Sequence, residues 1–143
     1  MAAYSTILAV EDSDEDFEAL VRAFHAVEPD LRVDRCVDGD EALDYLFRRG
    51  AYAEVAAPGL VVLDLNLPGT DGREVLEHVK ADDALRVLPI IILTTSGSPG
   101  DVHAAYRGGA NCYVQKALDP GEFRRRILAL RSFWLDAVIP ARD

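Results

Sequence analysis

Residues 60–72 read LVVLDLNLPGTDG, and this stretch decides the fold. Its first four residues are apolar without a break, as expected for a central strand of a parallel sheet that is covered on both faces. The run ends at Asp64, and a loop rich in Pro, Gly, Thr and Asp follows. An acid directly behind a buried strand is unusual for a structural position, because a buried charge needs a partner. Asp64 is therefore the first candidate functional residue.

Apolar runs of strand length alternate with segments of helical periodicity along the rest of the chain. The predicted strands are residues 6–10, 32–37, 60–63, 90–93 and 112–114, and the predicted helices carry the patterns at 17–27, 42–47, 72–80, 99–107 and 120–135. Asp38 is the expected N-cap of the second helix. Five β–α units predict an α/β fold, a doubly wound five-stranded parallel sheet with five helices, because parallel strands need helical crossovers.

The length of the chain favours one domain. With 143 residues, half of them hydrophobic, it is long enough to bury its own core. We expect a single domain over residues 1–143, with a core at about 5–130 and a C-terminal helical extension at 131–143 that is a candidate dimer contact.

Charge and hydropathy exclude two classes of partner. The net charge of −10 argues against nucleic acid, because that binding depends on Lys and Arg. No apolar run approaches a membrane span and the first six residues do not resemble a signal peptide, so we expect a cytoplasmic protein with no membrane partner. Cys36 and Cys112 lie in apolar strand contexts and are expected to be small buried hydrophobes.

Polar residues follow the predicted strands where a functional site is expected. In a doubly wound sheet, sites form outside the carboxyl ends of the strands, which here carry Glu11, Asp12, Asp64, Thr94 and Lys116. Closely packed carboxylates repel unless a cation joins them, and oxygen-rich clusters suit Mg²⁺. Asp64 closes the central strand and is the natural nucleophile for an acyl phosphate. Mg²⁺, Lys116 and Thr94 would then each take one oxygen of a transferred phosphoryl group.

Five motifs in order resemble those of two-component receiver domains, over essentially the whole chain. They are Val10-Glu11-Asp12-Ser13, Leu63-Asp64-Leu65-Asn66-Leu67-Pro68 with Asp71-Gly72, Leu93-Thr94-Thr95-Ser96, Gly109-Ala110, and Tyr113-Val114-Gln115-Lys116. The resemblance implies the flavodoxin-like receiver fold with strand order 2-1-3-4-5. It also implies a response regulator that is phosphorylated by a sensor histidine kinase and is not an enzyme beyond gaining and losing its own phosphoryl group.

The resemblance assigns roles residue by residue. It implies Asp64 as phosphoacceptor and places Mg²⁺ on the side chains of Asp12 and Asp64 and the carbonyl of Asn66, with Glu11 acting through water. Thr94 and Lys116 would bind the phosphoryl group. Thr94 and Tyr113 would form the switch, with the tyrosine turning inward on activation.

A narrower resemblance concerns residues 93–96 (LTTS), 109–113 (GANCY) and 133–135 (FWL). These segments are similar to those of the single-domain regulators paired with bacterial and cyanobacterial phytochromes. The similarity implies a bacteriophytochrome as the kinase and an output through protein–protein contact. A homodimer and onward transfer to a phosphotransfer protein are both compatible with such an output.

The chain departs from the receiver pattern after the lysine. Receiver domains usually carry Pro there, often with a cis peptide bond, whereas this chain has Ala117. A cis bond before Ala costs roughly 3 kcal/mol, so we expect a trans bond or an altered loop. The placement of Lys116 and the phosphoryl lifetime depend on this position. Glu11 replaces the commoner first Asp and is one methylene longer.

Simpler interpretations stand beside these. Glu11 and Asp12 could simply cap a helix without binding a metal. Thr94 could be a strand-end hydroxyl and Lys116 a solvated surface lysine. Tyr113 could be a packing residue.

Two other functions use a similar sheet. An aspartyl-phosphate phosphatase of the haloacid-dehalogenase kind also combines an Asp nucleophile with Mg²⁺, but it needs a second Asp two residues later, where this chain has Asn66. A flavin mononucleotide module would need an anion-binding first loop, and residues 11–16 contain five acids that would repel a phosphate.

Overall fold

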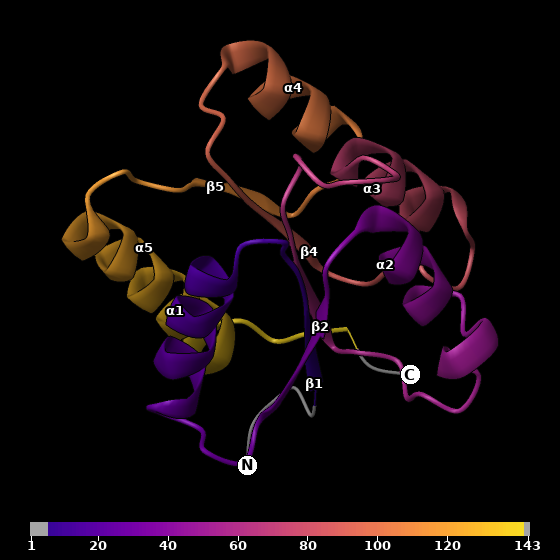
Figure 1. The fold of residues 1–143 in the computed structure, drawn as a ribbon, viewed down its shortest axis with the longest axis horizontal. Helices are drawn as coiled ribbons and strands as arrows, with labels where there is room; N and C mark the ends of the chain where they lie inside the picture. The colour runs from indigo at the N-terminus through magenta and orange to yellow at the C-terminus, as the bar shows by residue number, and fades with distance from the viewer. Residues whose placement is uncertain (1–5, 142–143) are drawn as a thin grey trace.

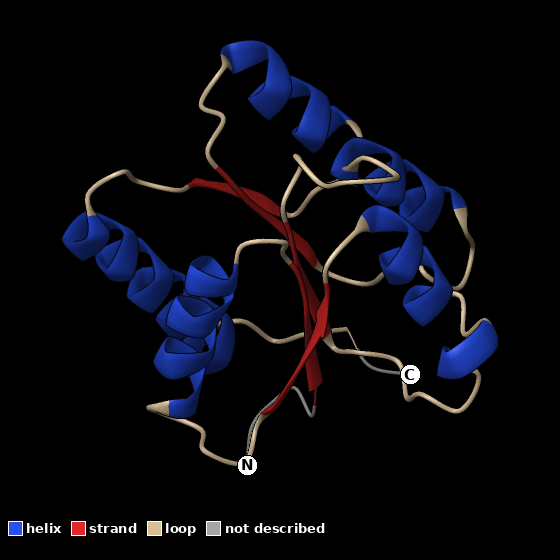
Figure 2. Ribbon diagram, in the orientation of Figure 1, coloured by secondary structure: helices blue, strands red, loops and turns tan. Residues whose placement is uncertain are grey.

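The computed structural model describes residues 6–141, in which a twisted parallel sheet lies between two layers of helices (Figure 1, Figure 2). All neighbouring strands are parallel and follow the order β2-β1-β3-β4-β5, which confirms the predicted topology. The strands are β1 (Thr6–Val10), β2 (Arg32–Cys36), β3 (Leu60–Leu63), β4 (Ile90–Thr94) and β5 (Cys112–Gln115).

The helices divide between the two faces of the sheet. In Figure 1, α1 (Asp14–His25) and α5 (Pro120–Ser132) lie side by side on one face. The other face is covered by α2 (Gly39–Leu46), α3 (Gly72–Ala81) and α4 (Pro99–Arg107). Side chains along β1, β3 and β4 alternate between the two cores, so these strands are buried on both faces. This is why their sequences read as continuous apolar runs.

Short polar side chains begin every α-helix. The side-chain oxygens of the N-cap residues accept hydrogen bonds from backbone N–H groups of the first helical turn, which satisfies donors that the helix itself leaves free. Asp38 acts in this way, as predicted. The N-caps are Ser13, Asp38, Asp71, Ser98 and Asp119.

The predicted elements differ from the observed ones mainly at their ends. The helix expected over 120–135 is divided, because the α-helix ends at Ser132 and a π-helical turn covers Phe133–Ala137. That turn buries Trp134 and leaves Phe133 exposed. Parts of three expectations lie outside the described residues. They are residue 5 of the expected core, residues 142–143 of the expected extension, and residues 1–5 of the segment considered as a signal peptide.

Two further expectations concern cysteines and membranes. Cys36 is buried as predicted, whereas Cys112 is only half-buried, and both are free thiols. Within residues 6–141, no helix combines the length and the apolar character that crossing a bilayer requires.

Candidate functional site

The carboxyl ends of four neighbouring strands bring the predicted site residues to one edge of the sheet. Backbone hydrogen bonds continue the strand pairing into this edge, so the positions of the polar residues are set by the sheet. The N–H of Asp64 donates to the Val10 carbonyl over 3.1 Å, and the N–H of Lys116 donates to the Thr94 carbonyl over 2.7 Å. The acid after β3 and the lysine after β5 are thereby fixed at the same end of the molecule.

Three acids form a cluster at this edge. Carboxylate oxygens of Glu11, Asp12 and Asp64 all lie within 4.8 Å of one another. Glu11 and Asp64 expose only 5% and 6% of their surface, whereas Asp12 is open to solvent. Burial raises the pKa of Glu11 to about 7, although the hydrogen bond from Lys116 opposes this shift. A set of hard oxygen donors with one open side fits a divalent cation that keeps some of its water.

Lys116 is the positive partner of the cluster. Its Nζ lies 2.7 Å from Glu11 Oε1, 2.8 Å from Asp16 Oδ2 and 2.9 Å from Asp64 Oδ2, which occupies all three ammonium donors. Burial by itself lowers the pKa of Lys116, but the hydrogen bonds to Asp16, Glu11 and Asp64 outweigh it and raise the pKa above its usual value. With 8% of its surface exposed, Lys116 is not a solvated surface lysine.

Two more groups surround Asp64. The backbone N–H of Asn66 donates to Asp64 Oδ1 over 3.1 Å and helps to orient the carboxylate, while the residue itself is exposed. Thr94 ends the adjacent strand, and its hydroxyl is fully buried with no hydrogen-bond partner among the described residues. A buried hydroxyl without a partner is uncommon and is available to an incoming oxygen ligand.

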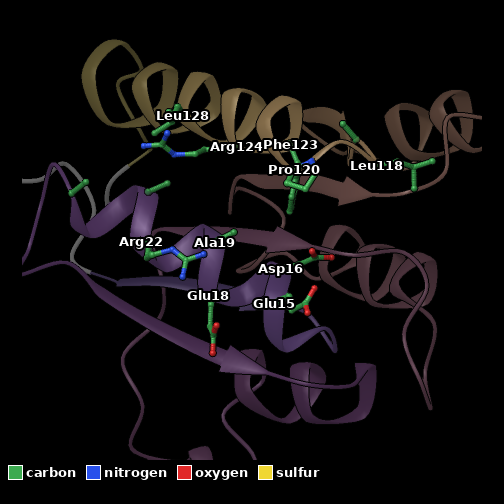
Figure 3. A pocket seen from close by; sticks show the side chains of 13 residues that line it. Glu15, Asp16, Glu18, Ala19, Arg22, Leu118, Pro120, Phe123, Arg124 and Leu128 are labelled. Carbon is green, nitrogen blue, oxygen red and sulfur yellow. The ribbon is translucent and has the colours of Figure 1, made fainter.

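The peptide bond after Lys116 is trans, as are all others in residues 6–141, in agreement with the expectation for Ala117. Ala117 packs against the core beneath α1 and α5. A groove of about 620 Å³ opens beside it between these two helices (Figure 3). Its α1 wall carries Asp16 and other acids, and Leu118 on the opposite side is almost fully exposed.

Tyr113 is connected to the loop that follows Thr94. Its hydroxyl donates to the Ser96 carbonyl over 2.9 Å. The Ser96 hydroxyl donates to Asp101 Oδ2 over 2.6 Å, and the same oxygen lies 3.1 Å from Arg73 Nη2. A chain of polar contacts thus joins the aromatic residue on β5 to the N-terminal ends of α4 and α3.

Sequence reasoning found most of this site and missed part of it. The structure brings together Glu11, Asp12, Asp64 and Lys116, with Thr94 at the end of the strand next to Asp64. Asp16 was missed, because its place in the first turn of α1, three residues after the N-cap Ser13, does not by itself show which residue it contacts. The contacts of Arg73 and Asp101 were also missed, because no sequence spacing connects two different helices.

Comparisons with known proteins identify relatives of the whole chain. The family model of the response regulator receiver domain matches residues 7–128. The response regulator Rcp1 of Synechocystis sp. is 37% identical over 136 residues, which cover 94% of this chain and 92% of that protein.

Two solved structures are also similar over 96% of this chain and 99% of theirs. The phosphorylated cyanobacterial phytochrome response regulator RcpA has a TM-score of 0.93 at 33% identity. The Mn²⁺-bound form of Rcp1 has a TM-score of 0.93 at 35% identity.

Proposed function

Because the chain belongs to the response regulator receiver domain family, we propose that it is a phosphorylation switch in which Asp64 accepts a phosphoryl group in the presence of Mg²⁺. The observation that carries this proposal is the buried ion pair between Lys116 and Asp64 inside a cluster of three acids. An ammonium fixed 2.9 Å from a nucleophilic carboxylate is ready to neutralise charge on a transferred phosphoryl group. Membership of the family also gives the chain a histidine kinase as partner.

In the proposed reaction an oxygen of Asp64 forms a bond to phosphorus while the bond from phosphorus to the phosphohistidine nitrogen breaks. Receiver domains bind a divalent metal, and here the side chains of Asp12 and Asp64 and the carbonyl of Asn66 would hold Mg²⁺, with Glu11 acting through water. The metal would supply positive charge against the phosphoryl oxygens. Lys116 would bind a second oxygen and the hydroxyl of Thr94 a third.

The response would be a shift between two conformations. The hydroxyl of Thr94 would turn toward the phosphoryl group, and the space it leaves would allow Tyr113 to move inward. Since Tyr113 bonds the Ser96 carbonyl, this movement would change the surface of α4 and β5. The output would be contact with another protein, either a second copy of the chain or a phosphotransfer protein.

The proposed setting follows from the relatives. RcpA is a phytochrome response regulator, so we take a bacteriophytochrome in the cytoplasm as the kinase. We take residues 1–143 as one receiver domain, which the single sheet with a core on each face supports. Exposed Phe133 and Ile139 near the C-terminus are candidates for a homodimer contact.

We prefer this switch to a phosphatase that turns over a separate substrate. Asn66 stands where such an enzyme needs a proton donor, and an amide does not exchange a proton in this pH range. The only chemistry we assign is gain and loss of the phosphoryl group on Asp64. A flavin phosphate is disfavoured because the exposed acids after β1 would repel it.

Acetyl phosphate tests the proposal directly. The purified chain is incubated with acetyl phosphate and Mg²⁺, and its intact mass is followed with time. We expect a gain of one phosphoryl group that disappears with EDTA or in Asp64→Asn. A gain that persists in Asp64→Asn would contradict the proposal, and so would its absence from the wild type with both acetyl phosphate and a phosphorylated phytochrome kinase.

A further inference from the structure

The backbone alone does not determine where the ammonium of Lys116 lies. The residue is anchored at its N–H by the Thr94 carbonyl, and a flexible chain of four methylenes separates that anchor from Nζ. Ala117 follows instead of a ring that would stiffen the loop. The position of Nζ therefore depends on its three carboxylate partners. Two of them, Glu11 and Asp64, belong to the acid cluster, and the third, Asp16, does not.

Asp16 is rigidly placed on the first turn of α1. Its backbone N–H donates to the Ser13 hydroxyl, which caps the helix. Its side chain is 26% exposed at the wall of the groove beside Lys116, where Figure 3 shows Asp16 and Glu15 on the same turn. Of the neighbouring acids, Asp14 pairs with Arg35 over 2.8 Å, and Glu15 is not among the partners of Lys116. Only one acid of this turn therefore reaches the ammonium.

We propose that Asp16 is a positioning residue that holds Lys116 beside Asp64 for phosphoryl transfer, an inference that rests on the proposed function. When Asp64 takes up the phosphoryl group, one ammonium donor passes to a phosphoryl oxygen. Asp16 and Glu11 keep the other two donors and so keep Nζ in place. Without Asp16, Glu11 is the one carboxylate that still holds Nζ once Asp64 is phosphorylated. The lysine then loses the orientation on which the rate of phosphoryl transfer depends.

Two isosteric variants separate positioning from charge. Asp16→Asn and Glu15→Gln each remove one negative charge from the first turn of α1, but only the first weakens a contact with Lys116. With acetyl phosphate and Mg²⁺, the phosphorus–oxygen bond to Asp64 forms as the bond to the departing acetate breaks. We expect Asp16→Asn to be phosphorylated about tenfold more slowly than Glu15→Gln, as for the loss of one charged hydrogen bond. Glu15→Gln should remain within about twofold of the wild type, as expected for an exposed charge.

A spectroscopic measurement tests the contact without relying on phosphorylation. The chain has only two lysines, Lys80 and Lys116, so ¹⁵N-labelled lysine gives two side-chain signals. Three acceptors should protect the Lys116 ammonium from solvent exchange and give a sharp ¹H–¹⁵N signal. We expect this signal in the wild type and in Glu15→Gln, and we expect it to broaden or vanish in Asp16→Asn. Lys80, which donates to the carbonyls of Arg86 and Leu88, is the internal reference in each sample.

The outcomes distinguish the two proposals. Equal phosphorylation rates of Asp16→Asn and Glu15→Gln, or an unchanged Lys116 signal in folded Asp16→Asn, would overturn the role of Asp16 and leave the phosphorylation switch intact. A wild type that takes up no phosphoryl group would overturn the switch itself. The lysine signals would then still decide whether Asp16 holds Lys116.

Discussion

Replacing Lys116 by methionine should destabilise the protein strongly when no divalent metal is present. The change keeps an unbranched side chain, one atom shorter, and removes the charge that three carboxylates contact at 2.7 to 2.9 Å. Glu11 and Asp64 are buried, so both would be left without a counterion. Removing one partner from a buried ion pair costs about 3 to 5 kcal/mol. We expect about 3 kcal/mol, the lower end of that range, because Asp16 reaches solvent and Glu11 can take up a proton.

Divalent metal should reverse most of this loss. A cation bound by the acids replaces the missing ammonium, and a ligand at about 100 times its dissociation constant stabilises the folded state by about 2.7 kcal/mol. Lys116 repels the same cation in the wild type, so Lys116→Met should bind Mg²⁺ more tightly. For a domain of this size, a loss of 3 kcal/mol corresponds to a fall in Tm of about 10 °C.

The assay is urea unfolding of both proteins in EDTA and in Mg²⁺. Lys80→Met is the matched control, because Lys80 is half-buried and donates to backbone carbonyls rather than carboxylates. Its change in stability should be the same in EDTA and in Mg²⁺. The reasoning is refuted if Lys116→Met is as stable as the wild type in EDTA, or if Mg²⁺ stabilises the two proteins equally.

Three further predictions follow from individual contacts. Asp101→Ala removes the contacts with Ser96 and Arg73, so the backbone amides of residues 96–98 should exchange faster in hydrogen–deuterium exchange while the free energy of unfolding changes little. Unchanged exchange would contradict the link. Gly72→Ala would place a Cβ 2.1 Å from the Asp64 carbonyl oxygen, and urea unfolding should report a loss of about 3 kcal/mol. A variant as stable as the wild type would show that this close approach is not needed. Burial raises the pKa of the Cys36 thiol well above its usual range, so iodoacetamide at pH 8 should alkylate it only after unfolding, and rapid native labelling would be inconsistent with its position.

Much of the fold was predictable because local and global signals agree. The runs at 60–63 and 90–93 are apolar at every position since both faces of β3 and β4 are covered, and helix N-caps such as Asp38 carry their own signature. The change from α5 to the π-helical turn at Phe133 was not predictable, because the apolar pattern continues across it.

The site was predictable to the extent that strand ends determine it. Contacts between helices and loops depend on helix phase and side-chain reach instead. Residues 11–16 contain five acids, and the sequence alone does not distinguish Asp14, which pairs with Arg35, from Asp16, which pairs with Lys116. The link between Arg73 and Asp101 likewise exists only once α3 and α4 are packed.

A crystal structure of the chain with Mg²⁺ and beryllofluoride, a mimic of the phosphoryl group, tests the central claim most directly. The account predicts beryllium on an oxygen of Asp64, with its fluorine atoms in contact with Mg²⁺, Lys116 Nζ and the Thr94 hydroxyl. Beryllium bound to Asp12 or Glu11, or bound to Asp64 with Lys116 turned away from the fluorine atoms, would contradict it.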